Sequence, residues 1–454
     1  MTGRTFGPSR CGNATTWRMS PLGCKGMVVA FGATLMLSAC SNHQTPPPGV
    51  GGIPAADQAA EQHGTRIGML LPLSGRNMRL GQQMANAAHL ALPEGHGAEL
   101  DLRDSDAAEG AAGAARAAIG NGDKIVLGPL TAAQTGEVAP LAQAANIPEL
   151  AFTSDSTQAR PGVWTMGLTP EQQVQRLVEA ARGQGKKKFA AFLPDNQFGH
   201  VMAQALIKAC AASALDSPNV IFHSHDAADI AQSLKTLSDF DARQSQVASA
   251  TPAEPDAVNP TSDQPAANPP ANGDSANAGA QSAANPPQPA SAPFPAPPFD
   301  ALLLADTGLD LANVINGLKA NKIDSNQVRI LGPALWNAFA LKLGALHGAW
   351  FAAPDPAARR SYVQHYRARY GSAPSVIADV AYDTAAMAGA LSRQENGFAS
   401  SSLTRADGFA GVDGVFALRP DGNVSRGLAV FEVLPGGGTK IALPAPRRLS
   451  QTPS

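Results

Sequence analysis

Strand-like apolar segments alternate with segments of helical periodicity along this chain, and no other feature limits its possible folds as strongly. In the first part of the chain the strand-like segments are 66–73, 100–106, 125–130 and 147–153. Helical segments separate them, the first at 81–92 and another opening at Thr131. This regular succession predicts an α/β fold in which a parallel sheet carries helices on both faces.

The same alternation restarts after residue 170 and predicts a second α/β lobe. Its strand-like segments are 187–193, 219–225, 299–306 and 327–332. A chain of 454 residues also exceeds the size at which a single hydrophobic core stops growing, about 250 to 300 residues. We therefore expect two lobes in series.

The charge balance argues against one large class of partners. The chain has 34 Lys and Arg against 36 Asp and Glu, which gives a formal net charge of -2. A protein that binds nucleic acid needs an excess of basic residues for its phosphate contacts. Nucleic acid is therefore not expected as a partner.

The first 39 residues have the pattern of an export signal. A basic segment without acidic residues precedes the apolar run 26–37, which is shorter than the roughly 20 residues of a membrane span. The run ends in Leu37-Ser38-Ala39-Cys40, which resembles the lipobox of bacterial lipoproteins. The resemblance implies cleavage of residues 1–39 and lipidation of Cys40. Ser41, where an aspartate favours the inner membrane, then favours the outer membrane.

Two segments have the composition of disordered chain. Residues 40–65 form a polar tether rich in Pro and Gly, and residues 242–298 form an insertion rich in Pro and Ala. Such segments bury too little apolar surface to offset their conformational entropy. Because the strand and helix pattern resumes after the insertion, we expect a disordered loop within a lobe rather than a hinge between domains. Residues 441–454 form a tail.

Several segments together resemble type 1 periplasmic binding proteins of the leucine-binding kind. These segments are 67–75, 127–156, 193–206, 380–391 and 411–433. In that family a cleft separates two lobes of parallel sheet, and the chain crosses between the lobes three times. The resemblance implies that lobe 1 comprises residues 66–168 and 334–410, and that lobe 2 comprises residues 169–333 and 411–440.

Residues 330–371, the lipobox and the insertion are most similar to lipoproteins that activate penicillin-binding proteins, the peptidoglycan synthases. Members of that group touch the synthase across the periplasm and are not enzymes. The resemblance implies a lipid-anchored, non-catalytic regulator of peptidoglycan synthesis that faces the periplasm. The alternative is the substrate-binding lipoprotein of an ABC transporter for branched-chain amino acids or amides, with a small amino-acid-like ligand.

Hydroxyl side chains at the ends of strands in lobe 1 are candidate ligand contacts, since ligands of open α/β sheets lie beyond the carboxyl ends of the strands. Thr131 opens a helix after the segment 125–130, where its hydroxyl and nearby N–H groups could hold a carboxylate. Thr153 and Ser154 end the next strand, where the resemblance places a second hydroxyl and amide pair. The alternative for Thr131 is a simple helix cap.

In that family lobe 2 supplies an aromatic side chain and an acid that face the ammonium group of the ligand. The aromatic position corresponds to Phe198, which lacks the hydroxyl usual in amino-acid binders, and the acid falls near Asp306 or Asp310. An acid after a strand is also commonly a helix cap. The lobe 2 half of an amino-acid site thus departs from the family pattern, which favours a protein partner over transport.

Motifs for catalysis are missing from the sequence, which has no Walker-type phosphate loop, no nucleophile-elbow serine and no paired-cysteine metal spacing. Cys210 lies in an apolar helical segment, where burial is expected rather than reactivity. His223 and His225, with Asp226 beside them, are the nearest approach to a metal site, and we expect them to be solvated. Neither enzyme activity, nor a metal, nor a cofactor is expected.

One helical segment is a candidate partner surface. Its aromatic and basic residues recur at helical spacing: Tyr362, Tyr366, Arg369 and Tyr370, beside Arg359 and Arg360. Tyr and Arg are enriched where protein partners contribute most binding energy. The alternative is a packed helix that leaves a polar face to solvent.

Overall fold

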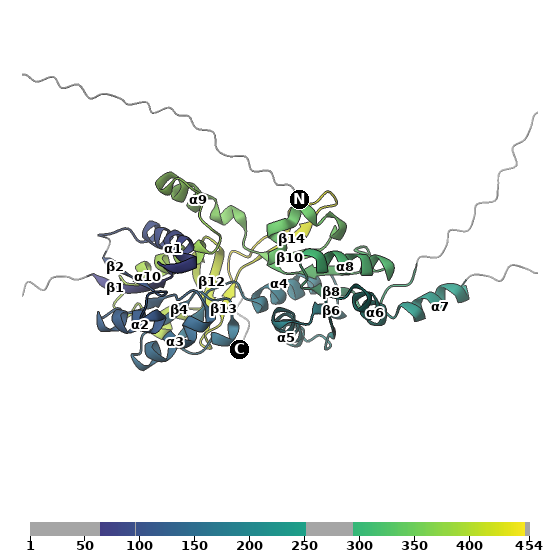
Figure 1. Cartoon of the computed structure of the whole chain (residues 1–454), viewed down its shortest axis with the longest axis horizontal. Helices are drawn as coiled ribbons and strands as arrows, with labels where there is room; N and C mark the ends of the chain where they lie inside the picture. The colour runs from purple at the N-terminus through teal and green to yellow at the C-terminus, as the bar shows by residue number, and fades with distance from the viewer. Residues whose placement is uncertain (1–63, 96, 251–293, 450–454) are drawn as a thin grey trace, which may run out of the picture. The chain divides into compact units, whose positions relative to one another are not determined.

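The computed structural model describes residues 64–95, 97–250 and 294–449 (Figure 1). The expected export signal, Cys40, most of the tether and the end of the tail lie outside these ranges. Within them, no helix is both long and apolar enough to cross a membrane.

Lobe 1 is built on a five-stranded parallel sheet in the order β2-β1-β3-β4-β5. Its strands are β1 (Thr65–Leu71), β2 (Ala98–Asp104), β3 (Val126–Leu127), β4 (Glu149–Ala151) and β5 (Val163–Thr165). The helices that cover it are α1 (Met78–Ala91), α2 (Gly110–Gly120), α3 (Ala132–Ala144) and α10 (Ala378–Leu391).

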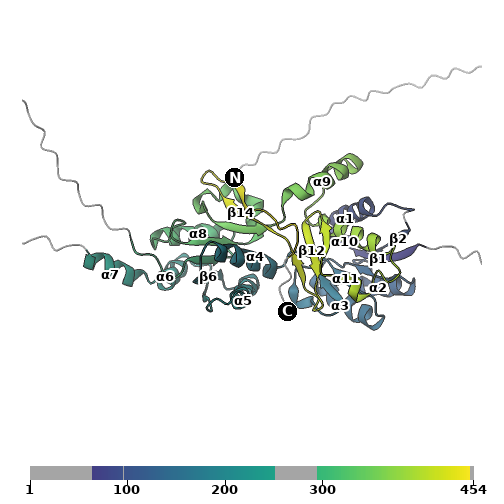
Figure 2. The ribbon, with the colours of Figure 1, turned by 180° about the vertical axis from the view of Figure 1, so that it is seen from behind.

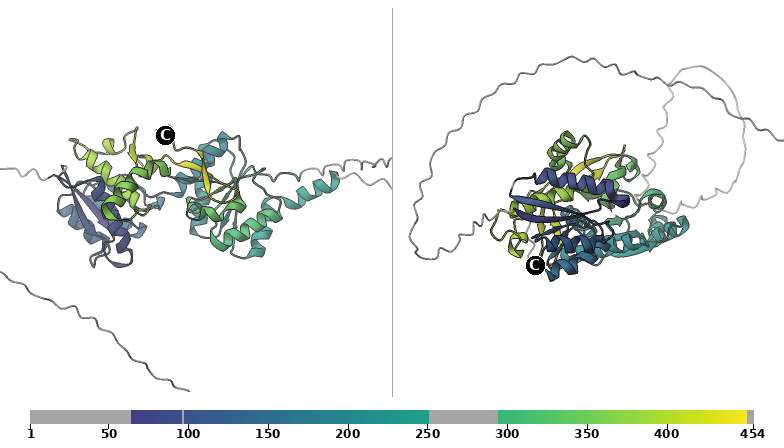
Figure 3. Two further views of the ribbon diagram at one scale, coloured as in Figure 1. Left: turned by 90° about the horizontal axis from the view of Figure 1, so that it is seen from above. Right: turned by 60° about the vertical axis from the view of Figure 1, so that its left-hand side comes forward.

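Side chains of β1 alternate between two cores. Ile67 and Met69 pack with α1 and α10, whereas Leu70 packs with α2 and α3. The helices lie on opposite faces of the sheet, as Figures 1 and 3 show. The apolar β1 segment thus belongs to a strand buried on both faces, and the predicted parallel α/β architecture is confirmed.

Lobe 2 is built on a seven-stranded sheet in the order β15-β14-β10-β9-β8-β6-β7. The parallel strands are β6 (Phe189–Pro194), β7 (Asn219–His223), β8 (Ala301–Leu304), β9 (Arg329–Gly332) and β10 (Trp350–Ala353); the antiparallel pair is β14 (Ala429–Val433) and β15 (Thr439–Leu443). On one face lie α4 (Pro170–Gly183) and α5 (Gln197–Ala212). On the other lie α6 (Ala227–Leu237), α8 (Gly308–Ala320) and the 3-10 helix η3 (Ala334–Lys342).

A small antiparallel sheet completes lobe 1. It comprises β11 (Phe409–Gly411), β12 (Gly414–Leu418) and β13 (Val424–Arg426). Phe416, Leu418 and Val424 belong to the same core as β1 and α10, and Figure 2 shows β12 beside α10. The remaining elements are α9 (Pro356–Tyr370), α11 (Ser400–Leu403), η1 (Gly75–Asn77), η2 (Ser156–Gln158) and η4 (Gly344–Leu346).

The chain crosses between the lobes three times, after β5, β10 and β13. Two of the expected boundaries are therefore wrong. Residues 334–353 belong to lobe 2, because Trp336 and Phe351 are buried in its core and β10 pairs with β9. Residues 411–426 belong to lobe 1, because Phe416 is buried there.

The ends of the expected insertion are folded. Residues 240–250 form α7 (Phe240–Ala250), and the buried Arg243 donates from Nε to the Pro295 carbonyl at 2.8 Å and from Nη1 to the Asn321 carbonyl at 3.0 Å. The Arg243 guanidinium also lies 4.8 Å from the centre of the Phe294 ring. The prediction of disorder is therefore wrong for 242–250 and 294–298, and residues 251–293 lie outside the described ranges.

Candidate functional site

Thr131 is a helix cap. It precedes α3 with extended backbone angles, and its Oγ1 accepts a hydrogen bond from the Gln134 N–H at 3.3 Å. Its hydroxyl also lies 3.1 Å from Oε1 of Gln134, whose Nε2 donates to Asp106 at 2.7 Å. Thr131 therefore makes the interactions of a helix cap, which was the alternative to a ligand contact.

Thr153 and Ser154, in contrast, line a cavity of about 370 Å³ at the carboxyl ends of β4 and β5. We call this cavity the hinge pocket. It is lined by Leu130, Phe152, Thr153, Ser154, Met166, Gly167, Leu168, Pro354, Val376, Ile377, Val380, Asp413 and Arg426. Thr153 is buried, and its Oγ1 accepts from the Asp155 N–H at 3.1 Å, while Ser154 is exposed. The structure brings these two predicted residues together and leaves Thr131 outside the lining.

Arg426 and Asp413 are the ionisable residues in the lining of the hinge pocket, and no sequence pattern distinguishes either of them. Arg426 ends β13, and its side chain is 3% exposed. Its Nη2 donates to the Met166 carbonyl at 2.9 Å, while Nε and Nη1 have no hydrogen-bond partner among the described residues. Oδ1 of Asp413 likewise has none within the described ranges. A single Arg at the end of a short strand carries no sequence signal that separates it from surface arginines.

Two further buried acids adjoin these residues from α10. Asp379 is bound by the guanidinium of Arg359, whose Nη2 donates to Oδ1 at 2.9 Å, and Asp383 accepts from the Val412 N–H at 2.7 Å. Burial raises the pKa of Asp379 to about 8 and that of Asp383 to about 7, and it also raises the pKa of Asp413. Asp383, 3.9 Å from Arg426, is therefore partly protonated near neutral pH and neutralises this guanidinium incompletely.

The acid expected at Asp306 is sequestered within lobe 2. Asp306 is 2% exposed, its Oδ1 lies 3.3 Å from Nε2 of His223, and its carbonyl accepts from Nε1 of Trp336 at 3.0 Å. The His223 ring stacks on Phe192 with centroids 4.3 Å apart. Burial lowers the pKa of His223, but the contacts with Asp306 and the Ser224 carbonyl outweigh it and leave this pKa above its ordinary value.

Asp310 and Phe198 are engaged in other contacts. The Asp310 carboxylate lies 2.8 Å from Nδ1 of the exposed His225, and Phe198 packs half-buried against the core beneath α5. Asp226 caps α6 through the N–H groups of Ala228 and Asp229. In the described part of the chain, no group of three or more His, Cys, Asp or Glu side chains is placed to hold a metal ion.

The tyrosines of α9 face inward. Tyr362 and Tyr366 are buried, and the Tyr366 hydroxyl donates to the Gln83 carbonyl of α1 at 3.3 Å. Arg359 is engaged by Asp379, whereas Arg360, Arg367 and Arg369 are exposed. The packed-helix alternative accounts for the tyrosines, and the exposed side of α9 is basic.

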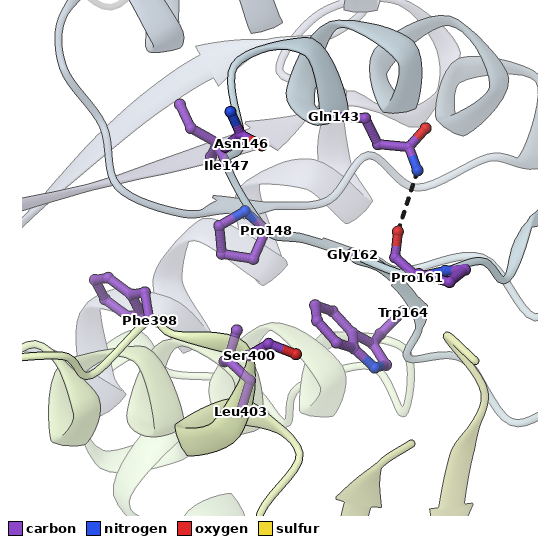
Figure 4. A pocket seen from close by; sticks show the side chains of 10 residues that line it. All are labelled: Gln143, Asn146, Ile147, Pro148, Pro161, Gly162, Trp164, Phe398, Ser400 and Leu403. Carbon is purple, nitrogen blue, oxygen red and sulfur yellow. Dashed lines mark hydrogen bonds between the residues drawn. The ribbon is translucent and has the colours of Figure 1, made fainter. Parts of the chain in front are cut away.

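A second cavity, of about 340 Å³, lies beside the amino ends of β4 and β5 (Figure 4). Pro148, Trp164, Phe398 and Leu403 line it, and Gln143 donates to the Pro161 carbonyl at its margin at 3.1 Å. Its lining contains no charged side chain and no predicted site residue. The hinge pocket, at the other edge of this sheet, is therefore the candidate ligand site.

Two parallel-sheet lobes, three crossings and a pocket where the crossings meet define a two-lobed binding protein. The chain belongs to the periplasmic binding protein family, whose model matches residues 64–438. The resemblance seen in the sequence and the type 1 fold that it implied are confirmed. Among curated proteins, none matches this chain.

Solved structures with this fold come from two functional groups. A putative branched-chain amino acid ABC transporter protein from Rhodospirillum rubrum is 19% identical, with a TM-score of 0.60 over 83% of this chain and 99% of that one. The C-domain of LpoA from Haemophilus influenzae, a regulator of PBP1A, is 16% identical, with a TM-score of 0.55 over 82% and 98%. Full-length LpoA from that organism has a TM-score of 0.56 at 16% identity, over 84% of this chain but only 59% of its own. These similarities show a shared fold.

Proposed function

We propose that this protein is a non-catalytic periplasmic lipoprotein that activates a peptidoglycan synthase of the penicillin-binding protein class. The observation that carries the proposal is the second-lobe half of the expected amino-acid site. The Asp306 side chain is fully buried beside His223 and so is inaccessible to an ammonium group, and the Asp310 carboxylate is paired with His225. A second lobe that offers no acid to the ammonium group of a ligand favours a protein partner over a free amino acid. The likeness to the C-domain of LpoA supports the same choice.

The exposed side of α9 suits an acidic partner. Arg360 and Arg367 are two helical turns apart and define the basic face of α9. The helix contains no acidic residue, and neither arginine forms an ion pair within the described ranges. α9 lies at the margin of lobe 1 in Figures 1 and 2. Unpaired charges on a surface guide association with a surface of opposite charge. We propose that the basic face of α9 docks on an acidic patch of the synthase.

The proposed membrane anchor is a lipid on Cys40, which would hold the protein at the periplasmic face of the outer membrane. Replacement Cys40→Ala should leave unprocessed precursor in cells and abolish incorporation of a radioactive fatty acid. Labelling that persists in this variant would contradict the anchor.

The interaction is tested with purified protein and a purified penicillin-binding protein from the same cells. The double variant Arg360→Glu, Arg367→Glu should weaken binding, and high salt should weaken wild-type binding, because both reduce attraction between opposite charges. The matched control is Arg116→Glu, Arg182→Glu, at exposed positions on α2 and α4. Equal loss of binding in both double variants would refute the assignment of the surface.

The second candidate function is the substrate receptor of an ABC transporter for branched-chain amino acids or amides. Thr153 and Ser154 favour this function, because both line the hinge pocket. The transporter protein of similar fold also favours it. A receptor should bind leucine or a small amide, with a rise in melting temperature that Thr153→Val removes. We expect no such rise with free amino acids, and its appearance would favour the receptor over the activator.

A further inference from the structure

The connection between α4 and β6 carries a run of positive charge. Residues 180–194 contain Arg182, Lys186, Lys187 and Lys188 and no acidic residue. We call these four residues the basic loop of lobe 2. The basic loop lies at the amino end of β6, on the edge of the sheet opposite the carboxyl ends of its parallel strands. It is therefore remote from the edge where ligands of open α/β sheets bind.

Neighbouring strands hold the backbone of the basic loop in place. The N–H groups of Lys187 and Lys188 donate to the carboxylate of Asp300, just before β8, at 3.0 and 2.9 Å. Oε1 of Gln184 accepts from Nη2 of Arg329, at the start of β9, at 3.2 Å. These contacts fix the loop to the edge of the sheet, so the fold sets the positions of its lysines.

The side chains of the basic loop, in contrast, point their charge outward. Arg182, Lys187 and Lys188 are exposed, and their side chains form no hydrogen bond or ion pair within the described ranges. Lys186 is half-buried, and its Nζ donates to the Gln327 carbonyl at 3.5 Å. Charges that make no contact inside the lobe act on surfaces outside it.

An anionic lipid surface suits this loop. The proposed lipid on Cys40 would keep the protein beside a bilayer, and each basic side chain near an anionic bilayer adds to binding within about 8 Å, the Debye length at physiological ionic strength. The residues from Arg182 to Lys188 include no large apolar side chain, so contact is through charge and not insertion. We propose that the basic loop of lobe 2 binds the anionic headgroups of a lipid bilayer. The proposal rests on the proposed anchor only for proximity to the bilayer.

The test is sedimentation with lipid vesicles of the purified chain from Ser41 onward, which lacks Cys40 and so carries no lipid. The vesicles consist of phosphatidylcholine with or without phosphatidylglycerol. We expect binding only to vesicles that contain phosphatidylglycerol, and high salt should weaken it. Absence of this binding, or equal binding to phosphatidylcholine alone, would overturn the proposal. Either result leaves lipidation of Cys40 unaffected, because fatty-acid labelling in cells tests the anchor separately.

Charge reversal locates the binding surface. The double variant Lys187→Glu, Lys188→Glu should lower the partition coefficient onto anionic vesicles at least about tenfold. The matched control is Arg360→Glu, Arg367→Glu, which changes the net charge equally on the exposed side of α9 and should bind as the wild type does. Equal loss in both double variants would show a response to net charge alone and would refute the assignment to this loop.

Two milder double variants guard against a loop that glutamates beside Asp300 displace. Lys187→Gln, Lys188→Gln should bind anionic vesicles more weakly than the wild type but more strongly than the glutamate variant, whereas Lys187→Arg, Lys188→Arg should bind as the wild type does. Loss of binding in the arginine variant would indicate a role of loop shape and refute a role of charge. Binding to isolated peptidoglycan but not to vesicles would assign the loop to the cell wall and also overturn the proposal.

Discussion

Glu149 makes lobe 1 less stable as the pH rises, and Glu149→Gln should remove this dependence. Glu149 starts β4, where it pairs with Val126 of β3 and Val163 of β5, and its side chain is fully buried. Neither carboxylate oxygen has a hydrogen-bond partner in the described part of the chain. Burial, partly offset by Arg160, raises the pKa of Glu149 from 4.5 to about 8.

The sign of the effect follows from proton binding. Between pH 4.5 and pH 8 the unfolded chain has released the proton of Glu149, whereas the folded chain retains it. The unfolding free energy therefore falls as the pH rises, by about 1.4 kcal/mol per pH unit for this one group. From pH 4.5 to pH 7 the loss amounts to about 3 kcal/mol. Below pH 4.5 the carboxyl is protonated in both states, and this contribution to the pH dependence vanishes.

The assay is urea unfolding followed by circular dichroism from pH 5 to pH 8. Because the amide of Glu149→Gln does not titrate, the difference in unfolding free energy between variant and wild type should grow in favour of the variant by up to about 3 to 4 kcal/mol over this range. A constant offset from the buried amide does not affect this slope. Glu137→Gln, at an exposed position on α3, should parallel the wild type. Parallel curves for Glu149→Gln and wild type would refute the reasoning.

Two further predictions concern packing. A methyl group on Gly81 of α1 would overlap a loop carbonyl after β1, so Gly81→Ala should lower the free energy of unfolding in urea by about 1 to 3 kcal/mol. The control is Gly120→Ala, where the added methyl group meets open space and should cause no such loss. Equal stabilities of the two variants would contradict the packing of α1. Replacing 251–293 by a short Gly/Ser link should leave the melting temperature nearly unchanged. Deleting 242–298 should lower it, because this deletion also removes the buried Arg243 and its hydrogen bonds to the Pro295 and Asn321 carbonyls. A longer deletion that melts like wild type would show that the ends of the insertion contribute nothing.

Much of the fold was predictable because its signals are local. The apolar segments of β1 and β6 and the helices that follow them carry the periodicity of strands buried on both faces, which determines a parallel sheet in each lobe. The assignment of β10 and of the small sheet β11–β13 to their lobes was not predictable. That choice depends on which core Trp336 and Phe416 enter, a matter of tertiary packing.

The candidate site was predictable only where its residues follow strands. Thr153 and Ser154 follow β4, and the rule for carboxyl ends of strands places them at the pocket. Asp306 obeys the same rule but is buried against His223, because both side chains turn into lobe 2. Arg426 reaches the pocket from a strand distant in sequence from Thr153, and nothing in its neighbours reveals that two of its nitrogens lack acceptors.

The rate of glycan polymerisation by a purified penicillin-binding protein, with and without this protein, tests the central claim most directly. The account predicts a faster rate with the wild-type protein and with Arg116→Glu, Arg182→Glu, and little or no stimulation with Arg360→Glu, Arg367→Glu. A synthase rate that the wild-type protein leaves unchanged would contradict the account, and binding of leucine by the same preparation would favour the receptor.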